Sequence, residues 1–147
     1  MADWKDNLVT DDAGIGELLR GTRRVAVLGI KTEAQSGEAA FYVAEYVAGH
    51  GGEIVPVPVY YPEVTEILGK KVYRKVADVP GPIDLVDVFR KPSDIPAHLP
   101  DLIQKRPGAV WFQLGIRNDA AAEELCRAGI RVVQDRCLKV EWARHRG

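Results

Sequence analysis

Cysteine and histidine are scarce in this 147-residue sequence, which contains two of the former and three of the latter. Cys126 and Cys137 form no C-x-x-C pair, and no histidine stands near them at the spacing of a zinc ligand. These absences exclude a zinc ribbon, a zinc finger and a framework of disulfides. We therefore expect two reduced thiols that pack as small apolar groups.

An excess of charge of either sign is also missing, because 20 Lys and Arg stand against 21 Asp and Glu, for a formal net charge of −1. No overall field attracts nucleic acid or an anionic membrane, so any anion site has to be local. The sequence also lacks a long apolar run and a basic leader followed by an apolar stretch. We expect a cytoplasmic protein with neither nucleic acid nor a membrane as partner.

Catalytic motifs are equally sparse. The sequence has no G-x-S-x-G elbow, no P-loop and no H-E-x-x-H pair, and none of its histidines stands where a general base is indicated. Asp87 lies near the carboxyl end of an apolar run, and we interpret it as an acceptor of backbone N–H groups rather than as a general base. The sequence therefore predicts neither an enzyme nor a metal site.

The sequence does contain a regular alternation of apolar strands and amphipathic helices. The apolar runs that predict strands cover residues 24–29, 53–59, 83–89, 109–114 and 130–134. Helical patterns lie between them, such as the one with Asn118 as N-cap and Gly129 after its end. This order predicts an α/β fold with a doubly wound, mostly parallel sheet and helices on both faces. We expect residues 1–147 to form one domain, with residues 1–21 as an N-terminal helical extension.

The segment after the first strand begins like a nucleotide-binding unit. Gly29 ends the strand, but the next glycine is Gly37, so the G-x-G-x-x-G fingerprint of dinucleotide-binding proteins is missing. We expect Ser36 to cap the following helix, whose free N–H groups and dipole favour a phosphate. Pro58 and Tyr60 stand where a nicotinamide dinucleotide requires an acidic ribose ligand, which disfavours simple NAD binding.

Basic side chains follow several of the expected strands. Ligands of parallel α/β sheets bind at the carboxyl ends of the strands, so these side chains are expected to converge on one crevice. Their number indicates a ligand with more than one phosphate. They are Lys31, Arg90, Lys91 and Arg117.

Four short motifs occur in one order along the chain, namely Ile67–Tyr73 (ILGKKVY), Asp87–Pro92 (DVFRKP), Gln113–Asn118 (QLGIRN) and Asp135–Glu141 (DRCLKVE). Together they resemble a family of small stand-alone bacterial CoA-binding proteins, which is similar to the nucleotide-binding domain of the succinyl-CoA synthetase alpha subunit. This resemblance implies a Rossmann-like sheet of order 3-2-1-4-5-6, with residues 71–73 as its edge strand. It also implies coenzyme A as the ligand.

The resemblance further implies where coenzyme A would lie. Backbone N–H groups of residues 29–36 would hold its pyrophosphate, with residues 58–60 and 89–92 beside the adenosine and the pantetheine arm. Residues 115–118 would close the crevice. The residues assigned in this way are Gly29, Ile30, Lys31, Thr32, Ser36, Gly37, Pro58, Tyr60, Phe89, Arg90, Lys91, Pro92, Gly115, Arg117 and Asn118. Ile30 and Lys31 replace the small residues that are usual in the family.

The expected function is non-catalytic binding of coenzyme A or an acyl-CoA, because the sequence has no room for the second domain and phosphorylatable histidine of a CoA ligase. Two alternatives stay open. One is an NAD(P)-dependent oxidoreductase in which Lys31 or Arg90 holds a 2′-phosphate. The other is a partner-binding module that keeps the fold but has no nucleotide ligand.

Overall fold

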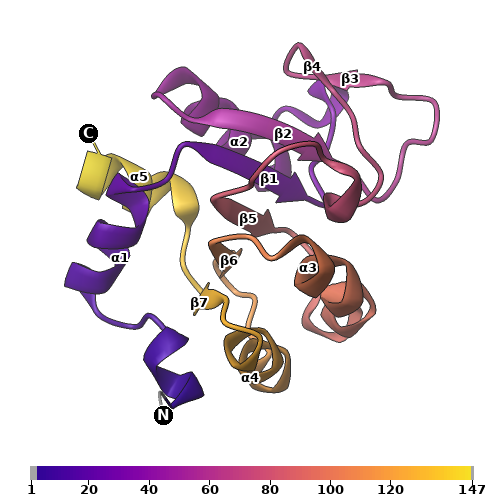
Figure 1. Ribbon diagram of the computed structural model, residues 1–147. Coiled ribbons are helices and arrows are strands. Elements are labelled where there is room, and N and C mark those ends of the chain that lie inside the picture. The colour runs from indigo at the N-terminus through magenta and orange to yellow at the C-terminus, as the bar shows by residue number, and fades with distance from the viewer. Residues whose placement is uncertain (1–2, 147) are drawn as a thin grey trace.

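A five-stranded parallel sheet forms the centre of the computed structural model, which describes residues 3–146 (Figure 1). The strands follow one another across the sheet in the order β2-β1-β5-β6-β7. Their bounds are β1 Arg24–Leu28, β2 Glu53–Val57, β5 Leu85–Val88, β6 Ala109–Phe112 and β7 Arg131–Val133. Every pairing within this sheet is parallel, so the predicted doubly wound α/β fold is confirmed.

Helices cover both faces of the sheet (Figure 1). One face is covered by α1 (Asp12–Arg20), α2 (Ala39–Gly49) and α5 (Leu138–Arg146), the other by α3 (Leu99–Lys105) and α4 (Asp119–Arg127). Short 3-10 turns lie at Trp4–Asn7, Glu33–Gln35, Val76–Asp78 and Pro92–His98. Neighbouring strand residues therefore enter two different cores: Val27 packs on the α1, α2 and α5 side, and Leu28 on the α3 and α4 side. This double burial explains why the strands appear in the sequence as continuous apolar runs.

The two cysteines are free, as the sequence predicts. Cys126 is buried in α4, and burial raises the pKa of its thiol to about 11. Cys137, just before α5, is partly buried. Because the thiol rather than the thiolate is favoured at Cys126, this residue acts as a packing group.

Residues 71–73 do not join the sheet as its edge strand, and in this respect the expected order 3-2-1-4-5-6 is wrong. A separate two-stranded hairpin is formed instead by β3 (Glu66–Ile67) and β4 (Lys70–Lys71). The hairpin projects beyond the end of β2 in Figure 1. The remaining part of the expected order, 2-1-4-5-6, agrees with the structure.

The prolines of β2 explain why no third strand pairs there. The Val57 carbonyl faces β1, where it accepts from Gly29 N–H, so the neighbouring residues Pro56 and Pro58 face the outer edge. Neither proline has an N–H group to donate to a further strand. One backbone hydrogen bond does reach this edge, from Tyr73 N–H to the Pro56 carbonyl at 3.0 Å.

The N-terminal segment covers the opposite edge of the sheet and then crosses one face. Leu8 forms an isolated parallel bridge with Val132 of β7, and Val9 N–H donates to the Val132 carbonyl at 2.9 Å. The next helix, α1, packs against α5 and buries an apolar stripe made of Ile15, Leu18 and Leu19. Among residues 3–146, no helix combines the length and apolar character needed to cross a membrane.

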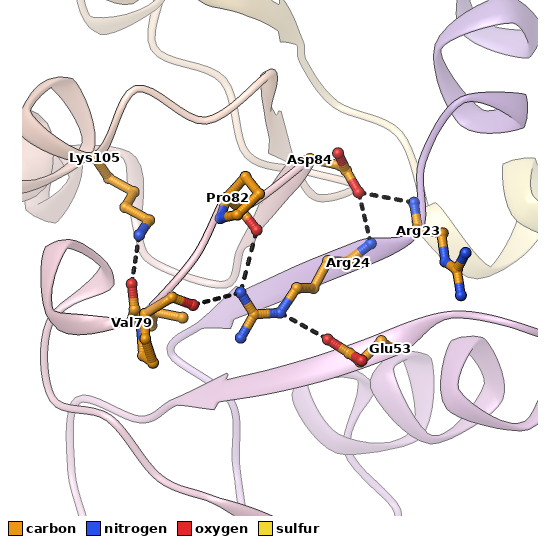
Figure 2. Close-up of polar contacts among 8 residues, drawn as sticks. Arg23, Arg24, Glu53, Val79, Pro82, Asp84 and Lys105 are labelled. Atoms are coloured by element: carbon orange, nitrogen blue, oxygen red, sulfur yellow. Dashed lines mark hydrogen bonds and ion pairs between the residues drawn. The ribbon is translucent and has the colours of Figure 1, made fainter.

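Arg24 joins two strands and a turn at the amino end of the sheet (Figure 2). Its Nε lies 2.7 Å from a carboxylate oxygen of Glu53 in β2. Its Nη1 donates to the carbonyls of Pro80 at 2.6 Å and Pro82 at 3.1 Å, in the turn before β5. These contacts lie at the end of the sheet opposite to the strand carboxyl ends, so they stabilise the fold without touching the expected ligand site.

Asp84 holds the backbone at the start of β1, next to these contacts of Arg24, and its replacement should test how much this end of the sheet contributes to stability. Its carboxylate accepts from the backbone N–H groups of Arg23 at 3.1 Å and Arg24 at 2.8 Å (Figure 2). Because both donors lose a charged acceptor, Asp84→Ala should lower the free energy of unfolding by about 1–3 kcal/mol, measured by chemical denaturation. Glu45→Ala, at an exposed position of α2, is the matched control and should change it by less than about 0.5 kcal/mol. Equal losses in the two variants would contradict the assignment.

Candidate functional site

The carboxyl ends of β1 and β5 meet where the chain order of the sheet reverses. The chain runs from β1 to β2 on one side and returns to β5 on the other. At this point Phe89 N–H donates to the Leu28 carbonyl at 2.9 Å, so residues 83–89 lie beside residues 25–29, as the expected strand order implies. Parallel α/β sheets bind their ligands outside such switch points.

Gly29 allows two backbone segments to approach each other at this junction. Its φ is +87°, a conformation that favours glycine. A Cβ at this position would overlap the carbonyl oxygen of Phe89 and lie 3.2 Å from Cδ of Arg90. The loop after β1 and the start of the loop after β5 therefore lie directly against each other.

The loop between Gly29 and α2 departs from the sequence prediction. Thr32 begins a 3-10 turn and donates its hydroxyl to the Gln35 side chain at 2.6 Å, while Gln35 also accepts from Thr32 N–H at 3.1 Å. Ser36 lies exposed at the end of this turn and does not cap α2, so the predicted N-cap is wrong. The side chain of Ile30 is 1 % exposed and packs in the core on the α2 side, so it leaves the loop surface free.

The N-terminus of α2 is open to a ligand. Glu38 occupies the N-cap position, but its side chain makes no hydrogen bond to the first turn of the helix. The first N–H groups of an α-helix have no partner within the helix, so they can bind an anion. Gly37 is exposed beside them, and a Cβ there would meet no atom within 4 Å.

Lys31 is close enough to add a positive charge at this helix end, but it already has a partner. Its Nζ lies 2.5 Å from a carboxylate oxygen of Glu38. This hydrogen bond raises the pKa of Lys31. An anionic ligand would therefore compete with Glu38 for the Lys31 ammonium group.

Arg90 lies in a polar cluster after β5. Its Nε donates to Nε2 of His98 at 3.1 Å, its Nη2 lies 3.5 Å from Asp94, and its guanidinium lies 5.7 Å from the centre of the Tyr60 ring. Burial, followed by the charge of Arg90, lowers the pKa of His98, which suits a neutral ring that accepts this bond. Sequence reasoning missed His98 and Asp94, because the local pattern after Arg90 carries no signal for either contact.

Arg74 fixes the segment that carries Tyr60, and it was also missed. Its guanidinium donates to the carbonyls of Tyr60 at 3.0 Å, Tyr61 at 2.9 Å and Val64 at 2.8 Å. Tyr61 has a φ of +64°, which is unfavourable for a residue other than glycine and needs such external support. The result is a fixed aromatic ring, 62 % exposed, beside Arg90.

The loop after β6 is joined to the same junction by Asn118. Its Oδ1 accepts from Ala121 N–H at 3.0 Å, so the predicted N-cap of α4 is confirmed. Its Nδ2 donates to the Pro92 carbonyl at 2.9 Å, which connects the loops after β5 and β6. Gly115 lies nearby in sequence, and its N–H donates to Asp135 at 2.7 Å.

Not every predicted residue faces the junction. Arg117 pairs with Asp119 at 3.1 Å and lines a different cavity of about 290 Å³ together with Thr10 and Arg136. Pro58 is buried, whereas Lys91 is exposed. The structure thus brings together the loops after β1, β2, β5 and β6, but it separates Arg117 from the expected cluster of basic groups.

Asp87 is a buried carboxyl group just below this junction. It is 0 % exposed and lies in register between Val27 of β1 and Trp111 of β6. Among the described residues neither of its oxygens has a hydrogen-bond partner, so the prediction that it accepts backbone N–H groups is wrong. In a central strand those groups are already used by the neighbouring strands. Burial raises the pKa of this carboxyl well above its usual range.

Comparison with known proteins identifies a family and several similar proteins. The family model described as "CoA binding domain" matches residues 23–143. The uncharacterized protein YneT of Bacillus subtilis (strain 168) is 31 % identical over 131 residues, which are 89 % of this chain and 93 % of that protein. The structure of cell-free ID.343 from Thermus thermophilus has a TM-score of 0.84 and 36 % identity, and the match covers 92 % of this chain and 99 % of the other.

A more distant likeness concerns a larger protein. A dinucleotide forming acetyl-coenzyme A synthetase from Ca. Korarchaeum cryptofilum is 19 % identical with a TM-score of 0.65. The match covers 80 % of this chain but 27 % of the synthetase chain. At this identity the likeness shows a shared fold.

The buried Asp87 should make stability depend on pH. The folded protein holds this proton above pH ~3.9, the usual pKa of an aspartate, where the unfolded chain has lost it. The free energy of unfolding should therefore fall as pH rises from about 3.9 to the raised pKa, by up to about 1.4 kcal/mol per pH unit. Asp87→Asn should remove this slope, as measured by urea denaturation between pH 4.5 and about 8.5. Parallel profiles for the two proteins would refute the prediction.

Proposed function

The chain belongs to the CoA binding domain family, and on this premise we propose that it binds coenzyme A or an acyl-CoA without catalysing a reaction. The site is formed by the carboxyl ends of β1, β2, β5 and β6. The observation that carries the proposal is the open N-terminus of α2 at the switch point of the sheet. The protein would act as one domain, and its free cysteines support a cytoplasmic location.

The pyrophosphate of coenzyme A would bind at the loop after β1. The N–H groups at the start of α2 are available there, and Gly37 leaves space above them. Gly29 and Phe89 bring the loop after β5 against this loop, and Asn118 connects the loop after β6 to it, so the pantetheine arm would lie across these loop ends. The exposed ring of Tyr60, which Arg74 holds through its backbone, offers a stacking surface for the adenine.

The basic side chains of the site are already paired with carboxylates of the protein. A ligand with several phosphates would have to displace these carboxylates. Lys31 is paired with Glu38, and Arg90 with Asp94. Each pair is partly exposed, so breaking it costs about 0–1 kcal/mol. Two or three phosphate groups would replace the carboxylates as partners of these basic side chains.

Binding without catalysis is proposed because the polar groups at the junction already have other roles. The neutral ring of His98 accepts from Arg90, and the carboxyl of Asp87 is buried below the backbone. An NAD(P)-dependent oxidoreductase is less well supported, since β2 is followed by Pro58, Val59 and Tyr60 and not by a carboxylate for the ribose.

Calorimetry with coenzyme A tests the proposal, with dephospho-CoA and NAD as comparison ligands. Gly37→Asp places a negative charge near the start of α2, where it should preserve helix stability but repel the pyrophosphate. We expect coenzyme A to bind at least about tenfold more weakly to this variant. Gly37→Asn is the matched neutral control and should stay within about threefold of the original protein.

The outcomes test separately whether coenzyme A is the ligand and where its pyrophosphate binds. If coenzyme A gives neither heat nor a thermal shift with the unaltered protein at millimolar concentration, coenzyme A is not the ligand. If coenzyme A binds but both Gly37 variants behave alike, the pyrophosphate lies away from the start of α2. A change in the absorption spectrum of NADPH on binding would favour the oxidoreductase.

Glu38→Gln should strengthen binding. The substitution removes a negative charge from the ligand site and releases Lys31. We expect coenzyme A to bind about two- to tenfold more tightly at low salt, with a smaller gain at high salt because screening weakens both effects. Glu123→Gln is the control, since it breaks an exposed pair with Arg127 on α4. Equal affinity in the two variants would show that Glu38 does not compete with the ligand.

A further inference from the structure

Three side chains from the two ends of the sequence meet between α1 and α5. They are Asp12, at the start of α1, and Glu141 and His145, one turn apart on α5. One ligand atom of each lies within 4.8 Å of the others. This group stands on the face of the sheet covered by α1, α2 and α5, and none of its members takes part in the proposed coenzyme A site.

The imidazole of His145 has two carboxylate oxygens as neighbours, of Asp12 and Glu141, but each is 3.5 Å from Nε2, too far for a good hydrogen bond. Its Nε2 is fully buried and, among the described residues, makes no hydrogen bond. The side chain as a whole is 11 % exposed, and that of Glu141 is 7 % exposed. A buried ring nitrogen without a partner is unfavourable, and a metal ion is one ligand that would remove this cost.

The distances from His145 to the two carboxylates fit a small divalent cation. Nε2 of His145 lies 3.5 Å from Oδ1 of Asp12 and 3.5 Å from Oε1 of Glu141. Zinc bonds of about 2.0–2.2 Å at tetrahedral angles place neighbouring ligand atoms ~3.3–3.6 Å apart. Two ligands at positions i and i+4 of one helix, with a third from another element, are a usual way to build such a site.

Gly16 makes room for the imidazole against α1. A Cβ on this glycine would lie 2.7 Å from Nδ1 of His145. The ring therefore lies directly on the backbone of α1, and its rotation is limited. This contact fixes the direction in which Nε2 points, as the surroundings of metal-binding histidines usually do.

Arg144 now balances the two carboxylates. Its Nη1 lies 3.1 Å from Oδ1 of Asp12 and 3.2 Å from Oε1 of Glu141. Its side chain is 50 % exposed, so it can move into solvent at small cost. The position between the carboxylates is thus already occupied by a cation, which a divalent ion would replace.

From these observations we propose that Asp12, Glu141 and His145 form a zinc site that joins α1 to α5. The three residues supply one imidazole nitrogen and two carboxylate oxygens, a set that suits zinc better than magnesium or calcium. Water would complete the tetrahedron on the exposed side, at Asp12. The site is independent of the proposed function.

Calorimetry with zinc chloride on the full chain tests the proposal, together with thermal denaturation. We expect saturable binding of one zinc ion and a higher melting temperature when zinc is present. Glu141→Gln and His145→Ala should each weaken binding at least about tenfold. His50→Ala should bind as before, because His50 is an exposed histidine that contacts the Tyr46 carbonyl instead.

A second pair of variants tests the roles of Arg144 and Gly16. Arg144→Gln should bind zinc more tightly, by about tenfold, because the competing cation is gone. Gly16→Ala should bind more weakly because it displaces the imidazole ring. Asp12→Asn, at an exposed position, should keep the fold and still weaken binding.

The proposal is overturned if neither the unaltered chain nor Arg144→Gln shows saturable binding with a dissociation constant below about 100 μM. It is also overturned if Glu141→Gln and Asp12→Asn bind zinc as well as the unaltered chain does, because the ion would then be held elsewhere. A loss of binding in His50→Ala would have the same meaning.

Discussion

The direct approach of the loop after β1 to the end of β5 is the constraint on which the site depends. Gly29 has no side chain, so the backbone at Phe89 can lie against it, and the two strands can stay paired up to their last residues. Any larger residue would separate the two loops at the place where a ligand of this fold has to enter. The open end of α2, the cluster around Arg90 and the connection from Asn118 to Pro92 all take their positions from this junction.

The strands of the sheet could be predicted from the sequence because each is buried on both faces. Runs such as Val25–Leu28 contain no polar residue, so the strand is visible in the sequence without knowledge of where the helices pack. The edge strand at residues 71–73 was predicted wrongly because pairing depends on free N–H groups, which Pro56 and Pro58 lack. The two prolines prevent pairing only because they face the outer edge of β2, and the side that they face is set by the register of β2 against β1.

The candidate site was only partly predictable, for similar reasons. Glycine at the end of a strand and a helix behind it are visible in the sequence, but the 3-10 turn that moves the start of α2 from Ser36 to Glu38 depends on the bond between Thr32 and Gln35. The contact between Arg90 and His98 spans a turn with two prolines, so no regular helix or strand spacing predicts it. Asp87 could not be interpreted correctly for a different reason. The sequence shows a polar residue in an apolar strand, but only the structure shows that its carboxyl has no hydrogen-bond partner among the described residues.

The packing of α1 on α5 has a consequence for how the chain folds during synthesis. Arg146 donates to the carbonyl of Leu19 at 2.9 Å, across 127 positions of sequence. Contacts of such long range form slowly, because a long loop has to close first. A nascent chain that has reached β6 still lacks α5, so the apolar stripe of α1 and part of one sheet face stay uncovered on the ribosome. The N-terminal helix is therefore made early but obtains its final partner last, and during that interval the chain is exposed to association with other apolar surfaces.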